Sequence, residues 1–125
     1  RINSECKPSY HAAASILSNQ VIAVLDTGYR LLESCGFSRE EARNATKELV
    51  RLNIENVLQH DCGAALTGPI ERGDIRTVQK HLDCIPKDDQ EMYQVLGAKL
   101  VEIARRKNPG RDYTELAKLM QKNGN

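Results

Sequence analysis

The 125 residues carry 18 Lys and Arg against 17 Asp and Glu, a formal net charge of +1, and 40% of them are hydrophobic. This length suffices for one domain with its own core, and the balanced charge argues against a nucleic-acid binder, which needs clustered, uncompensated Lys and Arg. No apolar run approaches the roughly 20 residues of a membrane span, so we expect a cytoplasmic protein that binds neither membrane nor nucleic acid. The four Cys residues lie far apart and form no C-x-x-C zinc half-site, so we expect free thiols and no metal.

The first predicted element is a long helix over residues 8–35. Pro8 suits a first helical turn, and Gly36 suits the left-handed position just after a helix end. Because the segment is long and rich in Ala, we expect it to be the central element of the fold. Its predicted apolar face consists of Ala13, Ile16, Leu17, Val21, Val24, Leu25 and Leu32.

A second helix is predicted over residues 38–59. Ser38 and Glu41 have the spacing of a capping box, in which each side chain binds the main-chain amide of the other residue. Its predicted buried face consists of Ala42, Ala45, Leu49, Leu52, Ile54, Val57 and Leu58. Residues 60–73 interrupt the periodicity with three Gly and one Pro, and we therefore expect a loop there.

Three further helices follow in the prediction. Asp74 caps a short one that Pro86 ends, and Asp88 with Glu91 begins the next. That helix extends to about Lys107 and is expected to bury Met92, Val95, Leu96, Leu100, Ile103 and Ala104. The last begins at Asp112 with Glu115 and places Leu116, Leu119 and Met120 on one side. No strand is predicted, so the chain is expected to be all-α, with about five helices around one long central helix in a single domain over residues 1–125.

Three polar residues interrupt the apolar face of the first helix. His11, Ser15 and Asn19 are four residues apart, which places them one above another on one face. They could form a satisfied polar ladder or a face exposed to water. Alternatively, they line a ligand cleft, where a His can donate or accept a proton near neutral pH.

The segment Thr67-Gly68-Pro69-Ile70-Glu71-Arg72-Gly73-Asp74 is the second candidate site. Its two Gly residues allow backbone conformations closed to other residues, and a helix start exposes N–H groups to an anion. Arg72 could bind a carboxylate or phosphate in a bidentate manner. Asp74, however, could occupy the same amides as an ordinary N-cap, which would make the segment a loop–helix junction without a ligand.

Together these motifs resemble a family of unknown function, the domain of unknown function 2520. There, an all-helical C-terminal domain follows a Rossmann-like NAD(P)-binding domain, and members are often described as oxidoreductases. The helical domain is similar to those of pyrroline-carboxylate reductase, ketopantoate reductase and 6-phosphogluconate dehydrogenase relatives, which implies a bundle like the C-terminal domain of the last. The residues that carry the resemblance are Tyr10-His11-Ala12-Ala13, Ser18-Asn19, Ala65 through Asp74, Thr77-Val78 and His81-Leu82.

The resemblance implies roles for both candidate sites. His11 and Asn19 match a polar residue that faces the nicotinamide site, and they are the predicted catalytic residues. Residues predicted to bind a small anionic substrate are Ser15, Thr67, Gly68, Pro69, Arg72, Gly73 and Asp74.

The resemblance also implies partners. This chain is expected to form a homodimer and to act with a Rossmann domain of the same polypeptide. NAD(P) is expected to bind that domain, so the chain alone should hold no cofactor and be inactive. The alternative is a non-catalytic helical module for oligomerisation or interaction. If His11, Asn19 and Arg72 converge on one open surface, the enzyme is favoured. If they are dispersed, or fully buried and bonded to one another, the non-catalytic module is favoured.

Overall fold

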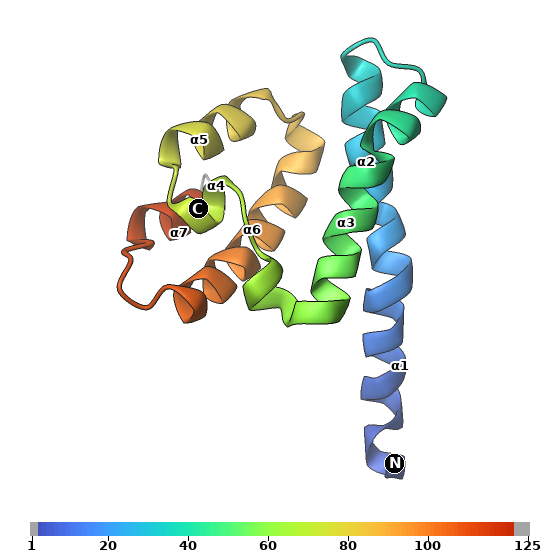
Figure 1. The fold of residues 1–125 in the computed structure, drawn as a ribbon, viewed down its shortest axis with the longest axis vertical. Helices are drawn as coiled ribbons and strands as arrows, with labels where there is room; N and C mark the ends of the chain where they lie inside the picture. Colours follow the sequence, from blue (N-terminus) through green and yellow to red (C-terminus); the bar gives the residue numbers. More distant parts are fainter. Residues whose placement is uncertain (1–2, 122–125) are drawn as a thin grey trace. The chain divides into compact units, whose positions relative to one another are not determined.

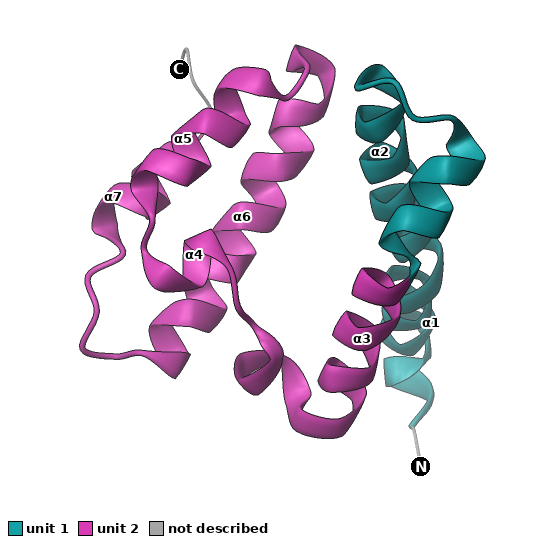
Figure 2. Cartoon of the chain, turned by 45° about the horizontal axis from the view of Figure 1, so that its top comes forward, with its two compact units in different colours: residues 1–47 teal, residues 48–125 magenta. Residues whose placement is uncertain are grey.

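The computed structural model describes residues 3–121, and all regular elements of this part of the chain are helices, without a strand (Figure 1). The predicted all-α class is therefore confirmed. The chain divides into two compact units, residues 1–47 and residues 48–125, and helix α3, Arg39–Ala65, contributes to both (Figure 2). Each unit is described below by itself, and the single domain stays a prediction. Among the described residues, no helix is long and apolar enough to cross a membrane.

The first unit begins with a long helical run. A 3-10 turn, Ser4–Cys6, leads into α1, Lys7–Ser15, then a π-helical turn, Ile16–Gln20, and α2, Val21–Ser34. The residues at each of these junctions have right-handed helical dihedral angles, so the backbone does not leave the helix between them. The predicted single long helix is confirmed, apart from the turn where it widens.

The end of α2 and the start of α3 are fixed by local hydrogen bonds. Gly36 has a φ of 107°, and the amides of Gly36 and Phe37 bind the carbonyls of Glu33 and Leu32, the Schellman arrangement that ends many helices. The predicted capping box is confirmed, since Ser38 N donates to the Glu41 carboxylate at 2.8 Å and Glu41 N to Ser38 Oγ at 3.0 Å.

An ion cluster joins α2 to α3. Arg39 binds Asp26 at 2.9 Å and Glu33 at 3.0 Å, and its guanidinium lies 5.5 Å from the ring centroid of Tyr29. The hydrogen bond from Arg39 to Asp26, together with one from Arg30, lowers the pKa of Asp26. The cluster orients the two helices, but exposed ion pairs such as these contribute little to stability.

The apolar faces predicted for the first two helices are largely unburied. Every residue from 3 to 20 is exposed, including Ile16 and Leu17, and the central position expected of this helix stays a prediction. In α3 only Ala42 is buried, whereas Leu49 and Leu58 are 71% and 78% exposed. The helical periodicity is thus confirmed, but most of the predicted apolar positions of these two helices are not buried within the described chain.

The second unit has a compact core built by four helices. They are α4, Pro69–Arg72, α5, Ile75–Cys84, α6, Lys87–Lys107, and α7, Thr114–Leu119. Figure 1 shows the short α4 enclosed by the other three. The buried side chains of this core are Ile70, Val78, Leu82, Val101, Ala104, Tyr113, Leu116 and Met120. The inward positions predicted for Leu116 and Met120 are confirmed.

The loop expected over residues 60–73 is mostly helical, so that prediction is wrong. Helix α3 continues to Ala65 across a kink at Asp61, whose φ and ψ of 71° and 170° lie in a region that is essentially limited to Gly. The kink lies at Asp61 rather than at the nearby Gly63. The Gly content of this segment therefore does not show where the helix bends. Pro69 then starts α4, because a Pro fits the first helical turn, where its missing N–H is not needed.

The buried face of α6 also differs from the prediction. The buried residues are Gln94, Gly97, Val101 and Ala104, whereas Val95 and Leu96, expected inside, are exposed. Gln94 is buried because its Nε2 donates to the carbonyls of Leu119 and Gln121 at the end of α7.

The starts of the last two helices differ by one or two residues from the prediction. Helix α6 begins at Lys87 after Pro86, before the predicted Asp88, because Pro86 ends the preceding turn and no side chain caps this start. Helix α7 begins at Thr114, whose amide donates to Asp112 Oδ1 at 2.9 Å. The predicted capping residue Asp112 is thus used, one residue outside the N-cap.

Gly97 allows α7 to approach α6, which gives a stability prediction. A Cβ at Gly97 would overlap Met120 Sδ, so we expect Gly97→Ala to lower the free energy of unfolding by about 1–3 kcal/mol despite the better helix propensity of Ala. Gly28→Ala in α2 is the matched control, because nothing lies within 4 Å of its Cβ, and it should raise stability by about 0.5–1 kcal/mol. Urea unfolding followed by circular dichroism measures both; equal effects of the two variants would contradict this packing.

Candidate functional site

The three polar residues of the first helix are exposed. His11, Ser15 and Asn19 all face solvent in the described chain, and no hydrogen bond joins them to one another. The His11 ring contacts only Tyr10, with ring centroids 6.2 Å apart, and Asn19 Oδ1 accepts a hydrogen bond from Ser18 Oγ at 3.4 Å. A buried, mutually bonded ladder is therefore absent, and these groups are available to a ligand or a partner.

Asn19 lies in the π-helical turn Ile16–Gln20. Single π turns inside α-helices are uncommon and occur frequently at functional sites. Here Ser18 Oγ donates to the carbonyl of Ala14 at 2.6 Å, a bond that Ser side chains commonly form within helices. The periodicity of the sequence gave no sign of this turn.

The segment from Gly68 to Asp74 is a one-turn helix with a complete set of end signals. Gly68 and Gly73 have φ of 98° and 75°, as expected for Gly, and Pro69 occupies the first turn. The amides of Gly73 and Asp74 bind the carbonyls of Ile70 and Pro69, a second Schellman arrangement. The motif therefore first encodes a tight helical turn.

Glu71 anchors this turn to the segment that joins α6 and α7. Its main-chain carbonyl accepts hydrogen bonds from Tyr113 OH and from Arg111 Nη1, the latter at 2.8 Å. Its carboxylate accepts one from Asn108 Nδ2 at 2.9 Å, and the same amide group also binds the Tyr113 hydroxyl oxygen. We call these four residues the Glu71 clamp. The sequence gave no signal for the clamp, because Asn108 and Tyr113 lie 37 and 42 residues further along the chain.

Asp74 caps α5 as predicted. Thr77 N donates to Asp74 Oδ1 at 3.1 Å and the Thr77 hydroxyl to Oδ2 at 2.8 Å, and these two bonds lower the pKa of Asp74. The carboxylate thus occupies a helix-start amide that the ligand hypothesis assigned to an anion. In this structure Asp74 acts within a loop–helix junction, and its contribution to folding is present above its unfolded pKa and lost as the pH falls through the lowered one.

Two residues of the motif remain without such a structural role. Thr67 is exposed and makes no hydrogen bond within residues 3–121, and the Arg72 side chain is 59% exposed with a long contact of 3.7 Å to Asp74. Within the motif, these two are therefore the predicted substrate-binding residues whose side chains are open to a ligand. His11, Ser15 and Asn19 belong to the first unit and residues 67–74 to the second.

A further polar pair lies downstream on α5 and α6. His81 Nδ1 and Tyr93 OH are 2.9 Å apart, and the two rings meet edge to face. Burial raises the pKa of Tyr93. Both side chains are partly buried, and their hydrogen bond links the two helices across the core. His81 belongs to the motif, but its partner Tyr93 lies too far along the chain for the sequence to predict the pair.

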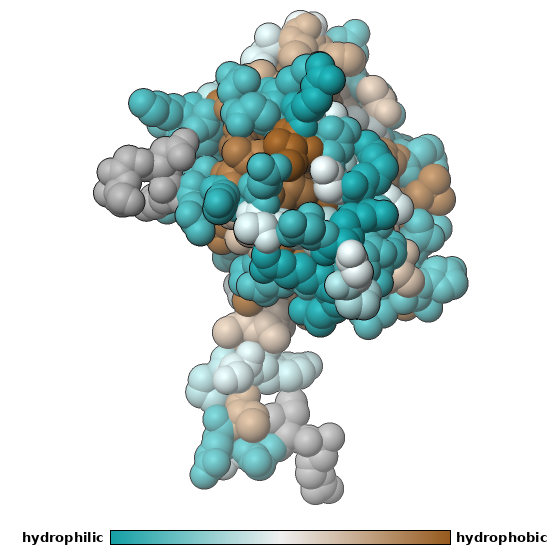
Figure 3. Space-filling model, turned by 90° about the vertical axis from the view of Figure 1, so that its left-hand side faces the viewer, coloured by the Kyte–Doolittle hydropathy of each residue, from teal (hydrophilic) through white to brown (hydrophobic). Residues whose placement is uncertain are grey.

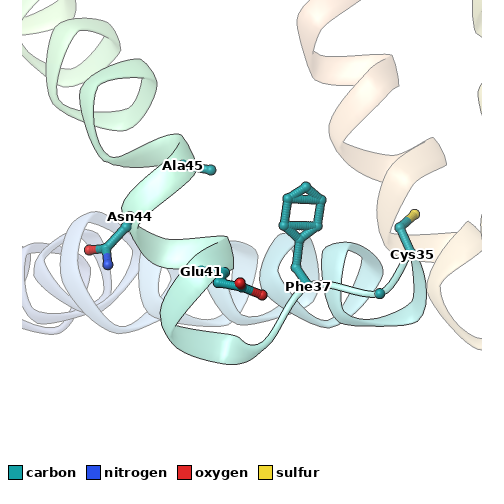
Figure 4. A pocket seen from close by; sticks show the side chains of 6 residues that line it. Cys35, Phe37, Glu41, Asn44 and Ala45 are labelled. Carbon is teal, nitrogen blue, oxygen red and sulfur yellow. The ribbon is translucent and has the colours of Figure 1, made fainter.

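The first unit contains a cavity of about 510 Å³ at the turn between α2 and α3. Figure 4 shows the Phe37 ring beside Cys35 and Ala45, whereas the Asn44 side chain points away from it. Glu41, also in the lining, is already used in the capping box. None of the predicted site residues lines this cavity. The four Cys residues are free and exposed, and within residues 3–121 no group of His, Cys, Asp and Glu could hold a metal ion.

These features define an all-helical domain whose sequence motif builds a clamped helical turn. The model of a family described as a domain of unknown function (DUF2520) matches residues 1–100, and the chain belongs to this family. The match includes both candidate sites. Neither a curated protein nor a solved structure matches the chain, so the likeness to the C-terminal bundle of 6-phosphogluconate dehydrogenase stays a prediction.

The Glu71 clamp can be tested by removing one hydroxyl. Tyr113 is 2% exposed, so Tyr113→Phe leaves the Glu71 carbonyl without its buried donor, and we expect a loss of about 1–2 kcal/mol in the free energy of unfolding. Tyr10→Phe is the matched control, since Tyr10 is exposed, and it should change stability by less than about 0.5 kcal/mol. Chemical denaturation compares the two, and a neutral Tyr113→Phe would show that the clamp is not needed.

Proposed function

We propose that this chain is the substrate-side domain of an NAD(P)-dependent oxidoreductase that acts on a small anionic carbonyl or imine compound. The observation that carries the proposal is the exposed row His11, Ser15 and Asn19, with Asn19 in a π turn of the same helical run. Exposed, mutually unbonded polar groups are what a ligand-facing surface requires.

The chain's own residues would bind and orient the substrate. His11 can share a proton with the carbonyl oxygen or imine nitrogen, the role that His side chains most often take in acid–base catalysis. Ser15 and Asn19 orient the same heteroatom by hydrogen bonding. Arg72, with Thr67 beside it along the chain, binds the anionic group, while Gly68, Pro69, Gly73 and Asp74 shape the turn that presents Arg72.

A nicotinamide, bound by a Rossmann domain of the same polypeptide, supplies the hydride. This chain offers no Gly-rich dinucleotide motif and no strand in its described part, so the cofactor belongs to that other domain. The exposed imidazole of His11 and the amide of Asn19 are the groups of this chain that could approach a substrate held against the cofactor.

His11 provides the test of this proposal in the complete polypeptide. We expect His11→Ala to lower turnover by about 100-fold or more, the usual size of general acid–base catalysis, while NADPH affinity changes less than about twofold. NADPH consumption with a panel of small 2-oxo and imino acids measures turnover, and fluorescence titration measures NADPH binding. His60→Ala, at another exposed His, is the control. Unchanged turnover in His11→Ala would remove His11 from the mechanism.

A second candidate function is assembly, as a homodimer through the first helix. Figure 3 shows hydrophobic surface on one face of the molecule. In the first helix, Ile16 and Leu17 are 59% and 77% exposed. Because every residue from 3 to 20 is exposed, this helix has an apolar face that a second copy could cover. Dimerisation is compatible with the enzyme and is the main role in the non-catalytic alternative.

Leu17→Glu tests the assembly. Burying one Leu contributes about 1.5–3 kcal/mol, so losing it in both copies should weaken the dimer by about 100-fold or more. Gln20→Glu adds the same charge at an exposed polar position of the same helical run and should change the dissociation constant little. Sedimentation velocity over a concentration series reads the association. A monomer in the unmodified protein, or equal effects of the two variants, would contradict a dimer through this face.

A further inference from the structure

The kink of α3 and the last turn of α6 enclose a cavity of about 470 Å³ in the second unit. It is separate from the residues of both sites described above. Its lining consists of Asp61, Cys62, Gly63, Ala64, Ile103, Arg106 and Lys107. The left-handed backbone at Asp61 turns the chain here, so that the short segment after the kink faces the end of α6 across the cavity.

The lining carries two positive charges and one negative charge. Lys107 is held in place, since its Nζ donates to the Leu66 carbonyl at 2.8 Å and retains two further N–H groups. Arg106 makes no ion pair or hydrogen bond within the described part of the chain, so its planar guanidinium is free to bind a ligand. Asp61 accepts the amide of Cys62 at 2.7 Å and pairs with neither cation.

Basic residues in a last helical turn commonly complement the helix dipole. That role accounts for the presence of Arg105, Arg106 and Lys107 in α6, but it does not require two of them to line a cavity or one to be fixed on the carbonyl of another segment. The net positive lining, the fixed Lys and the unpaired Arg are the chemistry of an oxyanion site, because a guanidinium binds two oxygens of a carboxylate or phosphate at once.

We propose that this cavity binds the carboxylate or phosphate group of a small molecule, with Arg106 and Lys107 as its ligands. Arg106 and Lys107 lie beyond residues 1–100, the part that matches the family. The site is independent of the substrate role proposed for Arg72, and it would persist if that role failed.

Amide chemical shifts of the unmodified protein, titrated with inorganic phosphate and separately with malonate at constant ionic strength, test the site. We expect changes centred on residues 62–64 and 103–107. Binding of both probes identifies a general oxyanion site, and binding of phosphate alone identifies a phosphoryl site. If neither probe moves these amides, or if the changes centre on residues 67–74, the proposal is overturned.

Three variants separate this cavity from general attraction of anions. Arg106→Gln should weaken binding at least about tenfold, whereas Arg105→Gln, which removes the same charge from the same turn outside the lining, should change it less than about twofold. Asp61→Asn removes the opposing charge and should strengthen binding several-fold. Arg72→Gln should leave it unchanged. Equal losses in Arg105→Gln and Arg106→Gln would show unspecific attraction and overturn the site.

Discussion

The Glu71 clamp is the constraint on which the geometry of the motif depends. A single helical turn such as α4 cannot hold its shape alone, because helix nucleation is unfavourable and one turn has only a few hydrogen bonds. Its position is fixed instead by Tyr113, Arg111 and Asn108, which bind Glu71 from the segment that joins α6 and α7. With Ile70 buried on one side and Glu71 bound, Arg72 is left to face outward.

The sequence predicts those structural features that depend on residues close together in the chain. The capping box of Ser38, the cap at Asp74 and the left-handed Gly36 and Gly73 each involve partners within five residues, so spacing alone identifies them. The partners of Glu71 lie tens of residues away, and no local pattern marks them. The prediction of the buried face of α6 was wrong for a similar reason. Gln94 is buried because its side chain binds a carbonyl at the end of α7, and this partner is distant in the sequence.

The sequence identifies the residues of the candidate site, but it does not predict their local structure or their exposure. His11 and Asn19 stand out because polar residues interrupt an Ala-rich helix, yet neither the π turn at Asn19 nor the exposure of both side chains follows from the spacing. The residue types of Gly68, Gly73 and Asp74 suggested a ligand-binding loop. In the structure these residues instead form the ends of α4 and the start of α5. The candidate ligand contacts of the motif are therefore Thr67 and Arg72.

The uneven distribution of the core connects these observations. Nearly all large buried side chains lie in α4 to α7, whereas residues 3–20 bury none, although this run also has to be ordered. A helix without tertiary packing is only marginally stable in water, because most helical stability in proteins comes from burying one face. The contacts proposed above, with a second copy or with a cofactor-binding domain, would bury the apolar side chains of Ile16 and Leu17. The run that carries His11 and Asn19 is therefore a part of the described chain whose own packing contributes little to its order.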